Sequence, residues 1–137
     1  MQLTKSYLDE LTFKINGACI EVHRNLGPGL LESVYHKCLK HELGMRNIKY
    51  ISELLIPINY KGINVEADFR CDLLIEESII IELKSVDTMH PIFTAQLLTY
   101  MKLMEKPKGI LINFNVVNLM KEGQQTFVNE HFRNLPL

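Results

Sequence analysis

The run Ile79-Ile80-Ile81 constrains the fold of this chain more than any other feature of its sequence. Three consecutive β-branched residues, followed by Glu82-Leu83-Lys84, are typical of a short strand that is covered on both faces. Helical layers on the two sides of a sheet are the usual cover for such a strand. A length of 137 residues corresponds to one ordinary domain, so we expect residues 1–137 to form a single α/β domain.

Helical spacing of apolar residues predicts the helices. A stripe with steps of three and four runs through Leu8, Leu11, Ile15, Ala18 and Val22. The glycines and proline within residues 25–29 end this helix. A second helix is expected over about residues 30–43 with Gly44 as its stop, and a third over residues 88–105.

Between these helices the pattern changes to that of strands. Strands are expected over residues 53–60, 65–75, 79–83 and 109–114, with one more short strand around 126–128. Lys61-Gly62 reads as a tight turn, and Pro57 indicates an edge position or a bulge. The element order is therefore α-α-β-β-β-α-β, in a central mixed sheet of four to five strands flanked by helices. The first three strands would be antiparallel, and the crossover helix would make the third and fourth parallel.

Composition narrows the classes of function. The formal net charge of −1 offers no sign of strong non-specific binding to nucleic acid, although a local basic groove could still exist. Three cysteines without a close pair do not fit a secreted disulfide scaffold, and no apolar stretch is long enough for a membrane span. The N-terminal residues lack the apolar core of a signal peptide. We therefore expect a cytoplasmic protein.

Three charged residues at the ends of expected strands indicate a candidate catalytic site. Glu82 and Lys84 share one face of the third strand because side chains alternate along a strand. A carboxylate at the end of a buried strand is costly unless it is paired or binds a metal. A hairpin would bring Asp72 near Glu82, and two carboxylates suit a hard ion such as Mg²⁺ or Mn²⁺. With Lys84 orienting a water or neutralising phosphate charge, these residues indicate metal-assisted hydrolysis of a phosphodiester.

Less specific interpretations of the same residues remain open. Glu82 with Lys84 could instead be an ion pair that closes the edge of the core. Asp68 and Arg70 could form a solvated or mutually paired strand face. Other chemistries lack their motifs, because the chain has no zinc-like Cys/His pairs, no HExxH sequence and no phosphate-binding glycine loop.

The sequence also resembles a known group of proteins. Asp72 followed by Glu82-Leu83-Lys84 resembles the PD-(D/E)xK motif of restriction-endonuclease-like nucleases, with Cys71 where the name of the motif has proline. Residues 29–35, Gly-Leu-Leu-Glu-Ser-Val-Tyr, resemble the signature of the small GxxExxY proteins, usually placed in the same superfamily. Residues 21–29, 67–74 and 95–100 also resemble that family, and the similarity extends over about residues 8–128.

The resemblance implies a restriction-endonuclease-like fold, nucleic acid as partner and a Mg²⁺ or Mn²⁺ cofactor. Asp72 and Glu82 would be metal ligands, and Lys84 the catalytic lysine. Glu32 would support the metal or its water, although an acidic side chain in the first turn of a helix is favoured by the helix dipole anyway. Gln96 would help to fix the site, with a buried structural hydrogen bond as the competing role. Tyr35 would be a core or wall residue that holds Glu32 in place.

Two alternatives to the nuclease interpretation remain open. A non-catalytic module could keep this fold to bind nucleic acid or a protein, which the near-neutral charge and small size favour. A homodimer is the other possibility, because an exposed first strand next to Pro57 would leave a sheet edge in need of protection.

Overall fold

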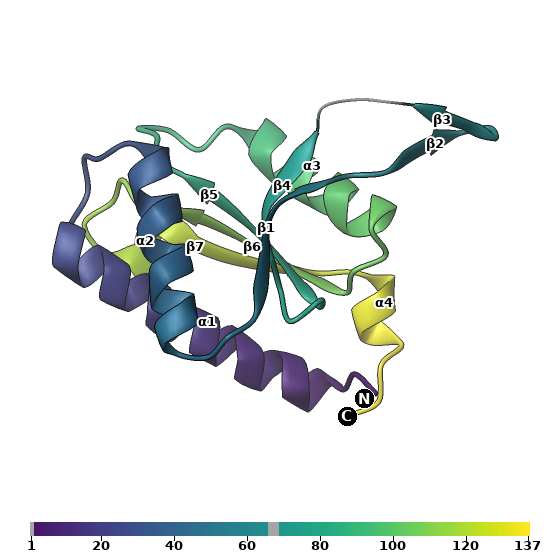
Figure 1. The fold of residues 1–137 in the computed structure, drawn as a ribbon, viewed down its shortest axis with the longest axis horizontal. Coiled ribbons are helices and arrows are strands. Elements are labelled where there is room, and N and C mark those ends of the chain that lie inside the picture. Colours follow the sequence, from purple (N-terminus) through teal and green to yellow (C-terminus); the bar gives the residue numbers. More distant parts are fainter. Residues whose placement is uncertain (1, 66–68) are drawn as a thin grey trace.

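The computed structural model describes residues 2–65 and 69–137, and its main sheet lies between two helical layers (Figure 1). The five strands of this sheet have the order β1-β4-β5-β6-β7. Helices α1 and α2 pack on one face, and α3 covers the other. The elements are α1 Lys5–Leu26, α2 Glu32–Met45, β1 Tyr50–Leu55, β2 Ile58–Tyr60, β3 Ile63–Val65, β4 Arg70–Ile75, β5 Ile79–Lys84, α3 Pro91–Leu103, β6 Lys108–Asn113, η1 Leu119–Gly123, β7 Gln124–Val128 and α4 Glu130–Arg133. The expected α/β fold with a mixed five-stranded sheet is confirmed.

The central strand β5 has the environment that its sequence predicts. Ile79, Ile80 and Ile81 are fully buried, with Ile80 against α3 and its two neighbours against α1 and α2. Strand β5 pairs antiparallel with β4 and parallel with β6, as the hairpin and the crossover helix require. Because β5 is flanked on both edges and both faces, any charged group at its end lies beside the core.

Two helix ends are decided by residues with positive φ. Helix α1 ends at Leu26, and Gly27 follows with a φ of 68° while its N–H donates to the carbonyl of His23. The expected stop at Gly44 is wrong, because α2 continues to Met45. Asn47 takes the left-handed conformation there instead, with a φ of 58°, and the Ile48 N–H closes the helix onto the carbonyl of Leu43.

The first two expected strands are each divided in the structure. Residues 53–60 form the end of β1 and then β2, because Pro57 and the buried Ile56 separate them. The turn at Lys61-Gly62 is confirmed, since both residues have positive φ and join β2 to β3. This hairpin projects away from the main sheet (Figure 1). Strand β1 pairs instead with β4, which begins only at Arg70, and Asp68 lies outside the described residues.

The C-terminal quarter contains more structure than the sequence pattern indicates. The short strand expected around 126–128 is β7, which begins earlier at Gln124 and pairs with β6. The π-helix η1 and the single-turn α4 were not predicted, since segments of four or five residues carry too little periodicity. The chain ends lie side by side, where the Lys5 N–H donates to the carbonyl of Pro136 (Figure 1). None of the described helices has the length and apolar character needed to cross a membrane.

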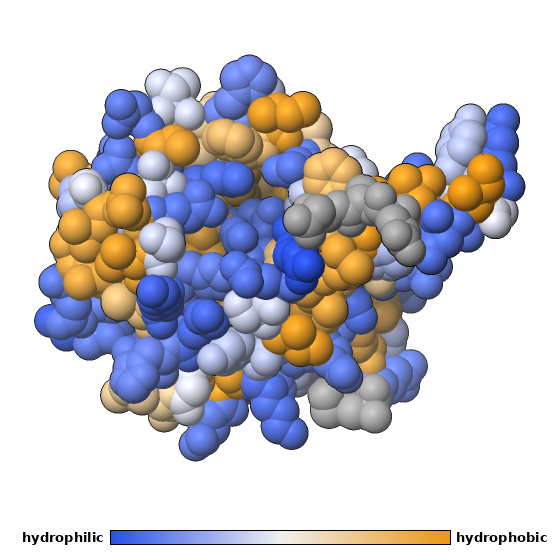
Figure 2. Space-filling model, turned by 45° about the horizontal axis from the view of Figure 1, so that its top comes forward, coloured by the Kyte–Doolittle hydropathy of each residue, from blue (hydrophilic) through white to orange (hydrophobic). Residues whose placement is uncertain are grey.

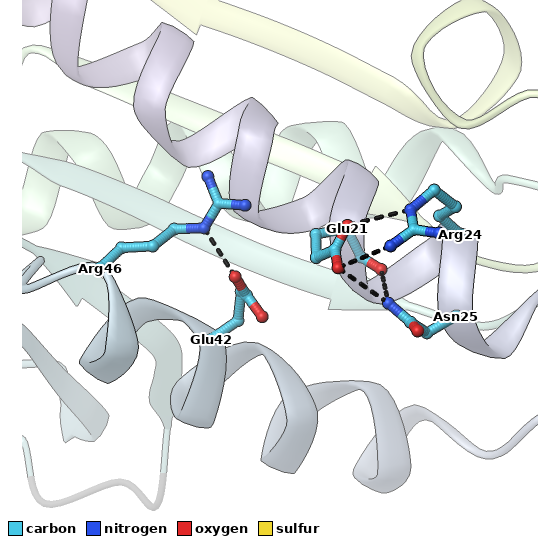
Figure 3. A network of polar contacts seen from close by, with 5 residues as sticks. All are labelled: Glu21, Arg24, Asn25, Glu42 and Arg46. Atoms are coloured by element: carbon cyan, nitrogen blue, oxygen red, sulfur yellow. Dashed lines mark hydrogen bonds and ion pairs between the residues drawn. The ribbon is translucent and has the colours of Figure 1, made fainter.

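One set of polar contacts on the surface of α1 and α2 stays within each helix or its end (Figure 3). Glu21 binds the guanidinium of Arg24 and the amide of Asn25, while Glu42 binds Arg46. Exposed ion pairs of this kind contribute roughly 0–1 kcal/mol each. The packing of these two helices on the sheet therefore depends mainly on their buried apolar residues.

Candidate active site

Asp72 and Glu82 face each other where β4 and β5 stop pairing. Leu73 pairs with Ile81, so Asp72 and Glu82 occupy the next position along the two strands. The Glu82 Oε2 accepts a hydrogen bond from the Asp72 N–H at 2.7 Å, and the Asp72 Oδ2 accepts one from the Leu83 N–H at 2.8 Å. Each carboxylate is thus held by the backbone of the opposite strand, which fixes one oxygen of each side chain.

The electrostatics of this pair favour a cation. Glu82 is only 5% exposed. Burial, followed by the negative charge of Asp72, raises the pKa of Glu82 to about 8, and a hydrogen bond between the two side chains adds to the shift. The hydrogen bond from the Asp72 N–H and the charge of Lys84 act in the opposite direction. A bound proton, or a positive ion between Glu82 and Asp72, would therefore stabilise this buried carboxyl group.

Lys84 lies beside the carboxylates without pairing with one. Its Nζ is 4.5 Å from the centre of the Phe93 ring, on the first turn of α3. Among the described residues, Lys84 forms no ion pair with an acidic side chain. The alternative interpretation, an ion pair that closes the edge of the core, is therefore wrong for Glu82 and Lys84. The ammonium is held by an aromatic face.

Glu32 contributes a third negative charge at the same end of the sheet. It is the first residue of α2, where the helix dipole favours a carboxylate. Its side chain is exposed at the surface, yet the loss of water around the carboxylate and the charge of Asp72 raise the pKa of Glu32. Lys84 partly offsets this effect. Glu32 is thus within electrostatic reach of Asp72 and Lys84, as its expected supporting role requires.

Tyr35 holds the loop that leads into α2. Its hydroxyl donates to the carbonyl of Gly27 at 2.6 Å and accepts from the Leu30 N–H at 3.2 Å. The ring is fully buried and stacks on Phe114 at 4.7 Å. The Ser85 hydroxyl donates to the carbonyl of Leu30 and joins this loop to the residue after Lys84. Tyr35 therefore positions the loop before Glu32, which agrees with the wall role expected for it.

Gln96 lies on α3, one turn before Tyr100. Its side chain is half-buried, and its amide makes no hydrogen bond within residues 2–65 and 69–137. The structural hydrogen bond expected as its alternative role is therefore not formed in this part of the chain. Burial, then the charges of Glu82 and Asp72, raise the pKa of Tyr100. The Tyr100 side chain belongs to the same buried cluster as Cys71, the residue before Asp72. Gln96 therefore lies one helical turn from a residue packed beside β4, and it makes no hydrogen bond to either carboxylate in the described part of the chain.

Sequence reasoning did not find several residues that build this site. Phe93 holds Lys84, and Asn113 ties down the loop after β5 by accepting from the Val86 N–H and donating to the Val86 carbonyl. Asn113 pairs with Lys84 across the parallel strands and is buried. A polar residue at the end of an apolar strand could have marked Asn113, whereas no sequence signal distinguishes Phe93 from the other apolar residues of α3.

The donor set is compatible with a hard divalent ion. Mg²⁺ commonly binds one or two carboxylates and completes its shell with water and substrate phosphate. Asp72 and Glu82 supply such a pair, each with one oxygen already committed to a backbone N–H. No group of three His, Cys, Asp or Glu side chains close enough to hold a metal occurs in the described residues. Within the part of the chain that the structure describes, the candidate protein ligands are therefore these two carboxylates, without a third beside them.

Comparison with known proteins agrees with this geometry. The family described as the PD-(D/E)XK nuclease superfamily matches residues 9–127. The crystal structure of SSO0001 is similar, with a TM-score of 0.52 and 25% sequence identity over 77% of this chain and 51% of that chain. The chain thus spans about half the length of that protein. No curated protein matches the sequence.

Proposed function

This chain belongs to the PD-(D/E)XK nuclease superfamily, and from that membership we propose that it is a divalent-metal-dependent hydrolase of phosphodiester bonds in nucleic acid. The observation that carries the proposal is the reciprocal hold on Asp72 and Glu82 by the opposite strands. Two carboxylates are kept face to face at the edge of a buried region, at a cost that a bound cation would remove.

Each residue has a role that follows from its position. Asp72 and Glu82 would hold Mg²⁺ or Mn²⁺, and the ion would supply Lewis-acid polarisation of the phosphate. Lys84, held by Phe93, would stabilise the negative charge that develops when water attacks phosphorus and the bond to the leaving oxygen breaks. Glu32 would orient that water from the start of α2. Gln96 would help to fix the substrate from α3.

The test is cleavage of labelled DNA and RNA by purified protein with Mg²⁺, with Mn²⁺ and with a chelator. We expect cleavage only with metal, and a loss of about 100-fold or more in Asp72→Ala and in Lys84→Ala. Lys121→Ala changes an exposed lysine of η1 and should cleave like the wild type. Unchanged cleavage in both Asp72→Ala and Lys84→Ala would overturn the proposal.

A second candidate function is a non-catalytic binding module. The observation that favours it is the donor set, since only two carboxylates are present and no third ligand joins them in the described residues. If this alternative holds, calorimetric titration with Mn²⁺ detects no site of millimolar or better affinity, and cleavage is absent on every substrate.

The homodimer expected from the exposed first strand stays a prediction, for which sedimentation at micromolar concentration is the measurement.

A further inference from the structure

A groove with a volume of about 280 Å³ opens between α3 and the segment that joins β1 to β2. Its walls are mainly apolar and aromatic, and they include Ile58, Phe69, Ile92, Gln96, Thr99 and Tyr100. Hydrophobic side chains gather around the base of the projecting hairpin in the space-filling view (Figure 2). Phe69 is 48% exposed, so a large part of its ring is available to a ligand.

The groove lies next to the strand that carries Asp72. Tyr100 lines the groove and belongs to the same buried cluster as Cys71, the residue immediately before Asp72. Phe69 precedes β4, three residues before Asp72. A molecule whose phosphate lies at the carboxylates can therefore place its neighbouring part in the groove.

The polar groups of the groove suit a flat ligand with hydrogen-bonding edges. The amide of Gln96 makes no hydrogen bond within the described part of the chain, so its donors and acceptor are available. The Thr99 hydroxyl donates to the carbonyl of Ala95, which leaves its oxygen able to accept. An aromatic wall combined with an amide is the arrangement with which proteins bind an unstacked nucleobase.

The net charge of the chain favours single-stranded over double-stranded nucleic acid as the ligand of the groove. With a formal net charge of −1, the chain has no excess of cations with which to neutralise many phosphates of a duplex. Stacking of bases on aromatic side chains supplies affinity that does not depend on such charge. In a duplex the bases are stacked and paired, so only an unpaired strand can enter the groove at little cost.

Building on the proposed function, we propose that the substrate is single-stranded nucleic acid and that this groove receives one of its bases. The base stacks on Phe69, and the Gln96 amide contacts its edge while the adjacent phosphodiester lies at Asp72 and Glu82. Ile58 and Ile92 form the sides of the groove and exclude water from the base.

The test measures binding without divalent metal, by fluorescence anisotropy of labelled 12-mers. The probes are a single strand, the duplex of the same sequence, and the single strand with its bases replaced by abasic sites. We expect the single strand to bind about tenfold or more tighter than the other two. Phe69→Ala should weaken its binding about 5- to 150-fold. Phe69→Tyr should bind like the wild type, and Phe13→Ala is the matched control, because Phe13 is 79% exposed on α1.

Binding and cleavage separate the two proposals. Equal binding of the three probes, or equal effects of Phe69→Ala and Phe13→Ala, would overturn the base-binding groove even if metal-dependent cleavage is observed. A single-strand preference that depends on Phe69 would support the groove even if no cleavage is observed. A dimer that dissociates in Phe69→Ala, together with no single-strand preference, would assign the groove to a second copy of the chain and overturn the proposal.

Discussion

The Lys84 ammonium lies 4.5 Å from the centre of the Phe93 ring. The lysine expected to take part in catalysis is thus held by an aromatic face on α3, while both neighbouring carboxylates are held by backbone N–H groups. This arrangement leaves the ammonium free of a partner carboxylate among the described residues, and so able to act on a substrate. The arrangement predicts the effects of several substitutions.

Phe93→Leu should lower cleavage without unfolding the protein. The substitution keeps an apolar side chain but removes the cation–π contact, which is worth about 0.5–2 kcal/mol, so Lys84 loses its fixed position. The matched control is Phe132→Leu, since the ring of Phe132 lies 5.4 Å from the Lys108 ammonium, away from the carboxylates. We expect kcat to fall about tenfold in Phe93→Leu alone. Equal kcat values in the two variants would contradict a positioning role for Phe93.

Asp72→Asn should stabilise the metal-free protein. The amide oxygen can still accept from the Leu83 N–H, whereas the charge that opposes ionisation of Glu82 is removed. We expect a gain of about 1–2 kcal/mol in the free energy of unfolding, measured by urea denaturation at pH 8 with a chelator. Asp9→Asn should have the opposite effect, because it leaves the buried Lys108 ammonium without its carboxylate. A loss of stability in Asp72→Asn would show that the carboxylates do not repel each other.

The stability of the metal-free protein should fall as pH rises. The pKa of Glu82 is raised from 4.5 to about 8, so the folded state retains a proton that the unfolded chain has already released. The stabilising contribution is fully present below about pH 4.5 and is lost as pH rises through about 8. We expect a decrease on the order of 1–3 kcal/mol between pH 6 and pH 9. In Glu82→Gln this decrease of the unfolding free energy with pH should disappear. A decrease as large as in the wild type would show that Glu82 is not its source.

Tyr35→Phe should loosen the loop before α2. The ring can remain stacked on Phe114, but the Gly27 carbonyl and the Leu30 N–H lose their shared partner. We expect a loss of about 1–3 kcal/mol in the free energy of unfolding and reduced cleavage, because Glu32 follows that loop. Tyr60→Phe, at an exposed position of β2, is the control and should be neutral. Wild-type values in Tyr35→Phe would mean that the loop is held by other contacts.

Thiol labelling tests the packing of both faces of the sheet. Burial raises the pKa of Cys19 to about 12 and that of Cys71 to about 11, and both side chains are fully buried. Because the thiolate is the reactive form, iodoacetamide at pH 8 should modify the half-buried Cys38 and spare the other two. Mass spectrometry of peptides after brief labelling is the measurement, with the urea-unfolded protein as reference. Rapid modification of native Cys19 would contradict the packing of α1.

Local patterns were sufficient for most of the architecture. The stripe from Leu8 to Val22 identified α1, and the isoleucines of β5 identified the strand buried on both faces. The juxtaposition of Asp72 and Glu82 was also predictable, because a three-residue turn after Ile75 brings adjacent strands into register. The interruption at Pro57 divided an expected strand, because the chain leaves the main sheet there to form the hairpin.

The sequence by itself determined the three long helices, most of the main sheet and the acidic residues that meet across one hairpin, because these depend on neighbours a few residues apart. Only the tertiary structure decided that Phe93 holds Lys84, that Ser85 secures the loop at Leu30, and that a groove opens beside Tyr100. Two of these features join segments that no local period relates, since Ser85 and Leu30 are 55 residues apart and the groove lies between α3 and the segment after β1. Such contacts depend on how the helices lie across the sheet, which apolar spacing alone does not specify.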